Sequence, residues 1–293
     1  MKSKRKNNLF YTLLFLAPAM AIFFVLSVYP LLRTLQLSLQ GARGEYTLKN
    51  FINVFTGPAL WETSRITVLF AVISTAFEMV IGFAFALVLN QRFFGRKALR
   101  TIFLIPWVIP TAIMAVGWKF ILQHSYGPFP WLLYWLGITK EVPYFLIMPK
   151  MAFISLIIAD VWKTVPFCAL LLLAGLQMIP EQLYEAADID GAGSIQKFIL
   201  ITLPLMIPTI VVTLMFRFLQ AFGIFDLVWV LTGGGPGDST LTLSVAIYRE
   251  ALRYINIGRG SAMAVVMAIY VVGILTVIRV MRKSLGKIYE AKA

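Results

Sequence analysis

Charged side chains are scarce in this sequence. They make up 13% of its 293 residues, whereas 60% are hydrophobic and the mean hydropathy is +0.84. About a quarter of a typical globular protein is charged, so this composition is typical of an integral membrane protein. The net charge of +13 comes from residues scattered between apolar runs, which argues against a nucleic-acid-binding protein.

Cysteine and histidine are almost absent. Cys168 is the single cysteine and lies in an apolar run, which excludes a disulfide framework, and one histidine cannot form a two-histidine metal site or relay. The glycine cluster at 233–237 lacks the Gly-Lys-Ser/Thr ending of a phosphate-binding loop. A segment that begins like a calcium loop at Asp188 has Ile199 where a glutamate ligand is needed. We therefore expect no catalytic residue, metal site or nucleotide site in this chain.

Six apolar runs approach the length of about 20 residues that a helix needs to cross a bilayer. They cover residues 9–32, 66–89, 99–122, 151–179, 205–231 and 262–281. The first is too long for the apolar region of a signal peptide, so we expect an uncleaved span although "APAMA" at 17–21 resembles a cleavage site. The sequence predicts an all-α integral membrane protein with about six transmembrane helices.

Lysines and arginines indicate the orientation of these spans. If the N-terminus is cytoplasmic, fourteen of them fall in cytoplasmic segments and nine on the opposite side. An excess of basic residues marks the cytoplasmic side. We therefore expect both termini to be cytoplasmic in a cytoplasmic (inner) membrane, together with the polar segment between the fourth and fifth runs.

That polar segment predicts two helices joined by a turn. Pro180 suits a first helical position, Gly191 can end the helix, and Ser194 can cap a second one. One face carries small and apolar residues as far as Asp190. An amphipathic helix lying in the membrane interface is one interpretation. Its acids, including Glu185, would be repelled by anionic lipids, which favours a protein partner with basic groups.

The same segment resembles the EAA signature of permease subunits in ABC importers. The residues that carry the resemblance, at the spacing of that signature, are Glu185, Ala186, Ala187, Gly191, Ile201, Leu203 and Pro204. The resemblance implies a type I ABC importer permease fold, with residues 1–293 as one transmembrane permease domain. It also implies that the loop 180–204 is a coupling loop, which docks in a cytoplasmic ATPase through a set that also includes Leu183 and Asp190.

Three further stretches resemble the MalF-type sugar permeases. They are "FLIPWVIPTAIMAVGWKF" at 103–120, "FDLVWV" at 225–230 and "LTGGGPGDSTLTLSVAIYREAL" at 231–252. The resemblance implies a second MalG-like permease, two ATPase subunits and an extracytoplasmic sugar-binding protein as partners. It implies that ATP and Mg²⁺ bind the ATPase, that this chain binds no cofactor, and that a sugar is carried. Glycerol phosphate or a polyol is an alternative substrate, and a secondary transporter is a more remote alternative.

Ionisable residues inside the apolar runs are candidate sites, because a charge near the bilayer centre is costly. They are Glu78, Asp160, Lys163, Arg217 and Asp226. Asp160 and Lys163 lie three residues apart on one helix, where they either neutralise one another or lie along a substrate path.

Phe222, Asp226 and Trp229 would share one face of a continuous fifth helix, opposite Arg217. An acid flanked by aromatic rings suits a sugar, although packing is the commoner role of such a face.

Overall fold

The computed structural model describes residues 15–41 and 44–290, and these residues are almost entirely helical. No strand occurs within these ranges, where one isolated bridge joins Gln40 and Tyr46. The all-α prediction is therefore confirmed. Several basic residues of the orientation count lie outside the described residues. They are Lys2, Lys4, Arg5, Lys6, Arg43 and Lys292.

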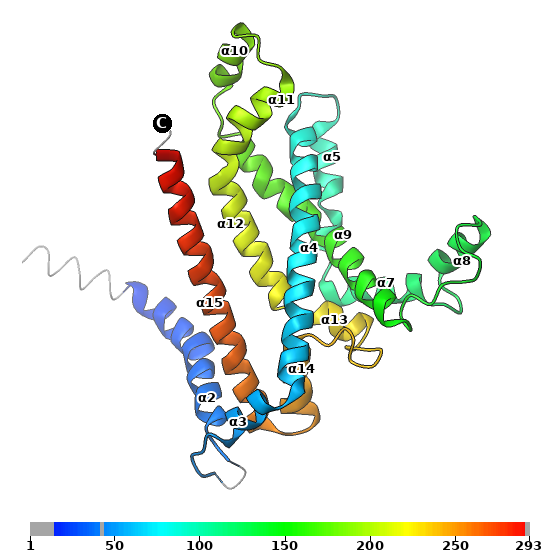
Figure 1. Cartoon of the computed structure of the whole chain (residues 1–293), viewed down its shortest axis with the longest axis vertical. Coiled ribbons are helices and arrows are strands. Elements are labelled where there is room, and N and C mark those ends of the chain that lie inside the picture. Colours follow the sequence, from blue (N-terminus) through cyan, green and yellow to red (C-terminus); the bar gives the residue numbers. More distant parts are fainter. Residues whose placement is uncertain (1–14, 42–43, 291–293) are drawn as a thin grey trace, which may run out of the picture. The chain divides into compact units, whose positions relative to one another are not determined.

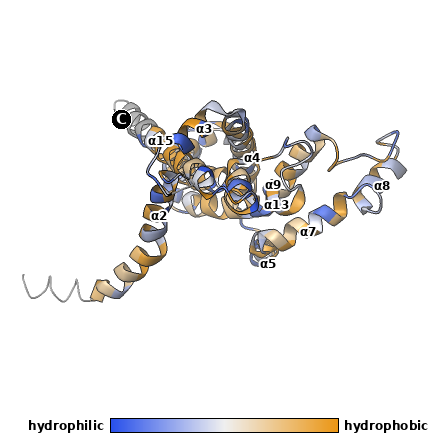
Figure 2. Cartoon of the chain, turned by 90° about the horizontal axis from the view of Figure 1, so that it is seen from below, coloured by the Kyte–Doolittle hydropathy of each residue, from blue (hydrophilic) through white to orange (hydrophobic). Residues whose placement is uncertain are grey.

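Five helices in the described part of the chain are long and apolar enough to cross a membrane. They are Phe15–Ser38, Pro58–Asn90, Pro149–Leu176, Ser194–Phe222 and Ile257–Arg279. A sixth crossing is formed if the bent pair Arg96–Val108 and Thr111–Leu122 counts as one span. Figure 2 colours most of the helical ribbon as hydrophobic, including segments whose side chains are exposed, as expected for helices that face lipid.

The third predicted span is broken rather than straight. Helices α5 (Arg96–Phe103) and α6 (Ile105–Val108) are followed by α7 (Thr111–Leu122), and the chain bends by 88° between α6 and α7. Ile109 and Pro110 are extended at the bend, with ψ of 129° and 133°. A residue before proline is pushed out of the helical region. Pro110 therefore ends the helix in the middle of an apolar run.

The fifth predicted span also ends early. Helix α12 (Leu203–Phe222) stops at Phe222, three residues leave the helical conformation, and α13 (Asp226–Leu231) begins separately. Upstream, α11 (Ser194–Lys197) and the π-helical turn η2 (Phe198–Thr202) lead directly into α12. The predicted fifth span, residues 205–231, is therefore divided between two separate helices, α12 and α13.

The chain forms two compact units. The first consists of Met1–Leu60 and Ala246–Tyr270. Its elements are η1 (Phe24–Val28), α2 (Tyr29–Ser38), α3 (Lys49–Thr56), η3 (Arg249–Arg253) and the first part of α15 (Ile257–Glu290). Asn50 on α3 donates hydrogen bonds to the carbonyls of Ser38 and Gln40, at 3.0 and 2.8 Å, which fixes the end of α2.

The second unit, Trp61–Val245 with Val271–Ala293, contains the candidate sites. Its elements are most of α4 (Pro58–Asn90), α5 to α7, α8 (Pro128–Trp135), α9 (Pro149–Leu176), α10 (Glu181–Ile189), α11 to α13 and the start of α14 (Leu243–Tyr248). Figure 1 shows α4, α9 and α12 together, with α10 and α11 beyond one end of α12.

Helices α4 and α9 run parallel and approach closely. Ser74 donates a hydrogen bond to Asp160, and a Cβ added to Gly82 would lie only 2.8 Å from Cβ of Cys168. In both contacts the residue on α9 comes 86 positions after its partner on α4, so the two helices run in the same direction. Glycine is needed at this close approach. Two parallel spans require the chain between them to return across the membrane, which supports counting the bent third run as a crossing.

Helix α12 completes the core by packing antiparallel to α9. Gly175 lies against Thr209 near one end, whereas Asp160 and Arg217 meet farther along. A buried apolar cluster fills the end nearest α10, and its members are Ala86, Leu89, Leu172, Leu173, Leu176 and Met206. Together, these contacts make α4, α9 and α12 a three-helix frame.

Candidate functional site: a charged cavity and an exposed loop

Three buried charges meet where α4, α9 and α12 come together. Arg217 donates through Nε and Nη2 to the two carboxylate oxygens of Glu78, at 2.7 and 2.9 Å, and Nη2 lies 3.7 Å from Asp160. Ser74 donates to Asp160 at 2.6 Å, and the Thr164 hydroxyl donates to Glu78 at 2.6 Å. The three charged residues are at most 4% exposed. Because an unpaired charge in a membrane is costly, this pairing stabilises their burial.

Lys163 binds the broken end of α6. Its Nζ donates to the carbonyl oxygens of Trp107 and Ile109, at 3.0 and 2.5 Å. These carbonyls lose their helical partners because the chain turns away before Pro110. An unbonded carbonyl inside a bilayer costs several kcal/mol. Lys163 therefore satisfies the backbone where the third run bends.

The break between α12 and α13 is satisfied in the same manner. The carbonyl of Ile224 accepts hydrogen bonds from the hydroxyls of Ser244 and Thr242, the latter at 3.4 Å. In both breaks, a side chain from another part of the unit replaces the missing helical donor.

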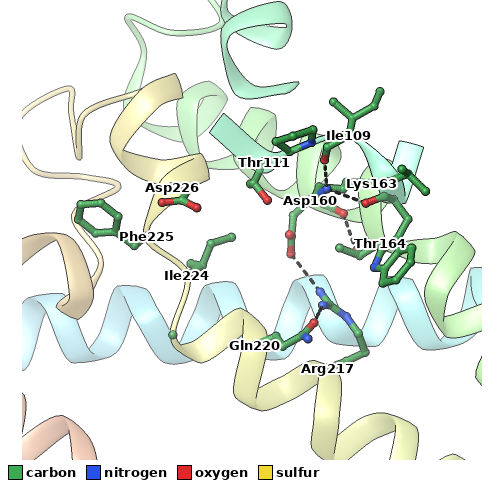
Figure 3. A pocket seen from close by; sticks show the side chains of 14 residues that line it. Ile109, Thr111, Asp160, Lys163, Thr164, Arg217, Gln220, Ile224, Phe225 and Asp226 are labelled. Carbon is green, nitrogen blue, oxygen red and sulfur yellow. Dashed lines mark hydrogen bonds and ion pairs between the residues drawn. The ribbon is translucent and has the colours of Figure 1, made fainter. Parts of the chain in front are cut away.

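Both breaks border one cavity of about 500 Å³. It is lined by residues 107–111 from the first break, residues 223–226 from the second, and by Asp160, Lys163, Thr164, Arg217 and Gln220. Figure 3 shows Thr111, Asp160, Gln220 and Asp226 arranged around this space. Gln220 and Asp226 are exposed. The cavity thus presents polar groups within an otherwise apolar membrane domain.

Two predictions about the charged residues are wrong. Asp160 and Lys163 do not form the direct ion pair that was one of their two interpretations, because Asp160 pairs with Arg217 while Lys163 reaches backbone carbonyls. Arg217 and Asp226 do not lie on opposite faces of one helix, because α12 ends between them, and both line the same cavity.

The predicted face of Phe222, Asp226 and Trp229 does not form, because α12 ends at Phe222 and the other two residues lie on α13. Phe222 is buried and stacks on Phe218, whereas Trp229 stacks on Phe225, each pair with ring centroids 6.2 Å apart. Among the described residues that line the cavity, Asp226 is included but Phe222 and Trp229 are not. Asp226 is thus the one member of that face that remains a candidate.

The sequence does not identify the partner of Glu78. Its carboxylate and Arg217 are 139 residues apart, and no local spacing relates them. The sequence shows only that the apolar runs contain both acidic and basic residues, which must find partners inside the membrane. Only the fold decides that Glu78 and Asp160 share Arg217.

The polar segment forms the two predicted helices. Helix α10 ends in a Schellman motif, in which Ala192 donates to the carbonyl of Ala187 at 2.9 Å and Gly191 to that of Asp188 at 3.1 Å. Gly191 has φ of +76°, a conformation that favours glycine. The predicted helix end is confirmed.

Two predicted helix starts are shifted by one residue. Pro180 is the N-cap of α10 rather than its first helical residue, and Gly193, not Ser194, is the N-cap of α11. The side chain of Gln196 accepts from the Gly193 N–H at 2.9 Å. The long amide side chain bonds the N-cap from within the helix, in the manner of the glutamine in a capping box.

Three polar contacts fix this segment to the frame and to itself. Lys197 pairs with Asp188 at 2.6 Å, and the hydroxyls of Tyr184 and Thr202 lie 2.9 Å apart. Glu181 pairs with Arg92, after α4, at 3.3 Å. The segment is therefore attached both to the start of α12 and to the turn that follows α4.

Helix α10 is uncovered. None of its residues is buried, and Ile189 and Leu183 are 88% and 43% exposed. Among the other predicted coupling residues, Glu185, Ala186 and Ala187 lie on this helix, and Asp190 and Gly191 follow its last residue. Leu203 and Pro204 lie in the first turn of α12. A helix of nine residues is too short to be stable by propensity alone, so an uncovered one needs a packing partner.

Comparison with known proteins agrees with this architecture. Residues 78–287 match the family described as "Binding-protein-dependent transport system inner membrane component". The "Trehalose/maltose transport system permease protein MalF" of Thermococcus litoralis is 40% identical over an alignment of 267 residues that covers 88% of this chain and 88% of that protein.

Two solved structures cover nearly the whole chain. One is titled "Crystal structure of a bacterial ABC transporter involved in the import of the acidic polysaccharide alginate"; it has a TM-score of 0.85 and 25% identity, and covers 97% of this chain and 98% of that one. The other shows the bacterial alginate ABC transporter "in complex with alginate pentasaccharide-bound periplasmic protein", with a TM-score of 0.82, 26% identity and 97% of each chain covered.

The family match covers more than half of the chain, and the resemblance seen in the sequence is confirmed. The multi-pass membrane location is confirmed with it, and the secondary-transporter alternative is set aside. This chain belongs to the family of binding-protein-dependent transport system inner membrane components, the membrane-spanning permease subunits of ABC importers.

Proposed function

We propose that this permease carries a sugar through the cavity between the two helix breaks. The observation that carries the proposal is that exposed Gln220 and Asp226 line a cavity whose buried charges already have protein partners. Sugar hydroxyls donate to a carboxylate and accept from an amide. The names of relatives that carry trehalose, maltose or alginate support a carbohydrate.

A phosphorylated substrate fits this cavity less well. Arg217 is the residue that would have met a phosphate, but all its guanidinium nitrogens contact Glu78, Asp160 or Gln220. Lys163 is equally occupied by backbone carbonyls. An exposed carboxylate at Asp226 repels anions. We therefore favour a neutral sugar or polyol over glycerol phosphate.

The exposed loop is proposed as the ATPase contact. Residues 1–293 would form one permease domain, whose coupling loop 180–204 faces the cytoplasm together with both termini. Leu183, Glu185 and the surrounding uncovered face of α10 would insert into one of two ATPase subunits, which bind ATP and Mg²⁺. A second MalG-like permease and an extracytoplasmic sugar-binding protein complete the importer; the complex of the alginate transporter with its periplasmic protein supports the latter.

The attachments of the loop suggest how movement would be transmitted. When the ATPases close, force on α10 would reach α12 through the Tyr184–Thr202 contact. It would reach α4 through the ion pair between Glu181 and Arg92, which lies in the turn after α4. Both α4 and α12 belong to the frame that holds the cavity. Movement of α12 relative to α9 would therefore alter the cavity's opening.

Copurification tests the proposed assembly. We would affinity-purify the chain from its native membrane in mild detergent and identify the proteins that accompany it. An ATPase subunit and a second permease are expected. A Leu183→Ala/Glu185→Arg double variant should reduce ATPase recovery, because both changes alter an exposed face of α10 without disturbing the core. Purification without any ATPase, even from crosslinked membranes, would overturn the assembly.

Uptake by the reconstituted importer tests the cavity. We would measure uptake of labelled trehalose and maltose in proteoliposomes containing the binding protein. An Asp226→Asn variant removes one charged acceptor and should raise the apparent KM for transport about tenfold, as expected for the loss of a hydrogen bond to a charged group. Glu141→Gln removes an exposed acid away from the cavity and serves as the matched control. Equal uptake by both variants would remove Asp226 from the path.

A further inference from the structure

The turn between α4 and α5 concentrates positive charge. Arg92, Arg96, Lys97 and Arg100 occur within nine residues, and the sequence has no acid between Glu78 and Glu141. Four basic residues directly after a membrane span attract anionic lipid headgroups by about 1 kcal/mol each, which is about fivefold in affinity. Among the residues that the structure describes, the carboxylate of Glu181 pairs with this turn, through Arg92. The turn therefore keeps an excess of positive charge.

Two of these arginines are held side by side without an acid between them. Arg96 and Arg100 are four residues apart on α5, and with the Gln177 amide oriented so that its oxygen faces them, each donates through Nη2 to that oxygen at 3.0 Å. Arg100 also donates to the carbonyl of Leu89 at 3.0 Å. Among the described residues, Nε of both arginines is buried without a hydrogen-bond partner. Like charges at this spacing repel, and a neutral amide does not compensate them.

Exposed aromatic residues lie beside these charges. Phe93 and Phe94 follow Arg92 at the tip of the turn, and they are 40% and 105% exposed. Gly95, with φ of +81°, then reverses the chain into α5. Aromatic side chains flanked by basic residues are typical of segments that insert into the boundary between lipid headgroups and acyl chains. Neither ring packs into the protein's own core.

A cavity of about 320 Å³ is lined by Arg92 and Arg96, together with Gln177 and Glu181, and Arg100 reaches the amide of the same Gln177. We propose that this turn, residues 92–100, binds the phosphate of an anionic phospholipid, with Arg96 and Arg100 as the principal donors and Phe93 and Phe94 inserted in the membrane interface. Guanidinium groups suit a phosphate because their planar donors match its oxygens. The exposed phenylalanines favour a lipid over free phosphate.

Lipid binding to the full-length purified chain would be measured by native mass spectrometry. The detergent-solubilised protein would be titrated with phosphatidylglycerol, with phosphatidylcholine as the neutral-headgroup control and inorganic phosphate as a competitor. We expect preferential binding of phosphatidylglycerol. An R96Q/R100Q variant should bind it at least tenfold more weakly, from about fivefold for each arginine. K140Q/K150Q removes the same charge from exposed lysines elsewhere and should bind as the unmodified chain does.

A second variant keeps the test decisive if the double arginine change prevents folding. Phe94 is fully exposed, so Phe94→Ser leaves the packed core intact. It should weaken phosphatidylglycerol binding about tenfold, as expected for a phenylalanine withdrawn from an apolar environment. Equal binding of both lipids, or unchanged binding by the variants, would overturn the proposal. The proposal would also be overturned if the R96Q/R100Q variant bound phosphatidylglycerol normally but no longer copurified with the ATPase, because the turn would then be a protein contact. Sugar uptake is not measured, so failure here leaves the proposed function untouched.

Discussion

Replacing Arg217 with glutamine should be among the most destabilising single changes in this protein. Arg217 is the cation between two buried carboxylates, Glu78 and Asp160, and both lie within 3.0 Å of the single hydroxyl of Ser74. A glutamine cannot balance their charge. The R217Q variant would leave two buried acids facing one another without a compensating cation.

The size of the effect follows from the geometry. At a separation of 3.7 Å and an effective dielectric constant of about 20, the attraction between Arg217 and Asp160 is about 4 kcal/mol. Removing one member of a buried ion pair costs about 3–5 kcal/mol, because its partner remains buried without compensation. We therefore expect R217Q to lower the free energy of unfolding by about 3–5 kcal/mol.

The effect of Glu78→Gln should be smaller. This change leaves Arg217 paired with Asp160, so the local charge remains balanced. In the double variant E78Q/R217Q, one acid and the base are removed together. The loss of stability should then be less than the sum of the two single losses by at least about 2 kcal/mol, the coupling energy expected for contacting charges.

Unfolding of the purified chain in mixed micelles with increasing denaturing detergent, followed by tryptophan fluorescence, measures these differences. Arg65→Gln removes an exposed arginine from the same helix as Glu78 and should change the free energy of unfolding by less than about 0.5 kcal/mol. Additive losses in E78Q/R217Q, or an R217Q variant as stable as the R65Q control, would refute the view that this cluster holds the frame together electrostatically.

Three other changes test the loop, the helix break and the frame. Gly191→Ala should lower uptake severalfold without reducing assembly, because the left-handed conformation costs about 1–2 kcal/mol for other residues; Gly193→Ala, at φ of −70°, should not. Lys163→Met should lower the free energy of unfolding by about 1–3 kcal/mol for each carbonyl left unbonded, with partial recovery in Lys163→Arg. Gly82→Ala should cost about 1–3 kcal/mol in the same unfolding assay, because its Cβ would press on α9, whereas Gly117→Ala has no neighbour within 4 Å and should be tolerated.

Local patterns predicted several features well. The apolar runs anticipated the long helices, because a span must satisfy its own backbone and present apolar side chains over about 20 residues. The position of Gly191 anticipated the end of α10, since helix termination depends on one residue's φ. The spacing from Glu185 to Pro204 led to the family to which the chain belongs.

The breaks were harder to predict, because hydropathy reports composition and not continuity. Residues 99–122 and 205–231 are both apolar throughout most of their length, yet both are interrupted. Prolines occur in spans that stay helical, such as Pro166 in α9, so proline alone does not decide the matter. A break persists where another element supplies donors to the freed carbonyls, as Lys163 and Ser244 do.

By itself, the sequence determined the membrane class, the family and the exposed loop, because each depends on residues close together in the chain. Tertiary structure alone decided the partners of the buried charges. Glu78, Asp160 and Arg217 belong to three helices, and they meet because α4 packs parallel to α9 while α12 returns beside it. Charge pairing acts over a few ångströms in space, and no pattern along the chain records which helices the fold brings within that distance.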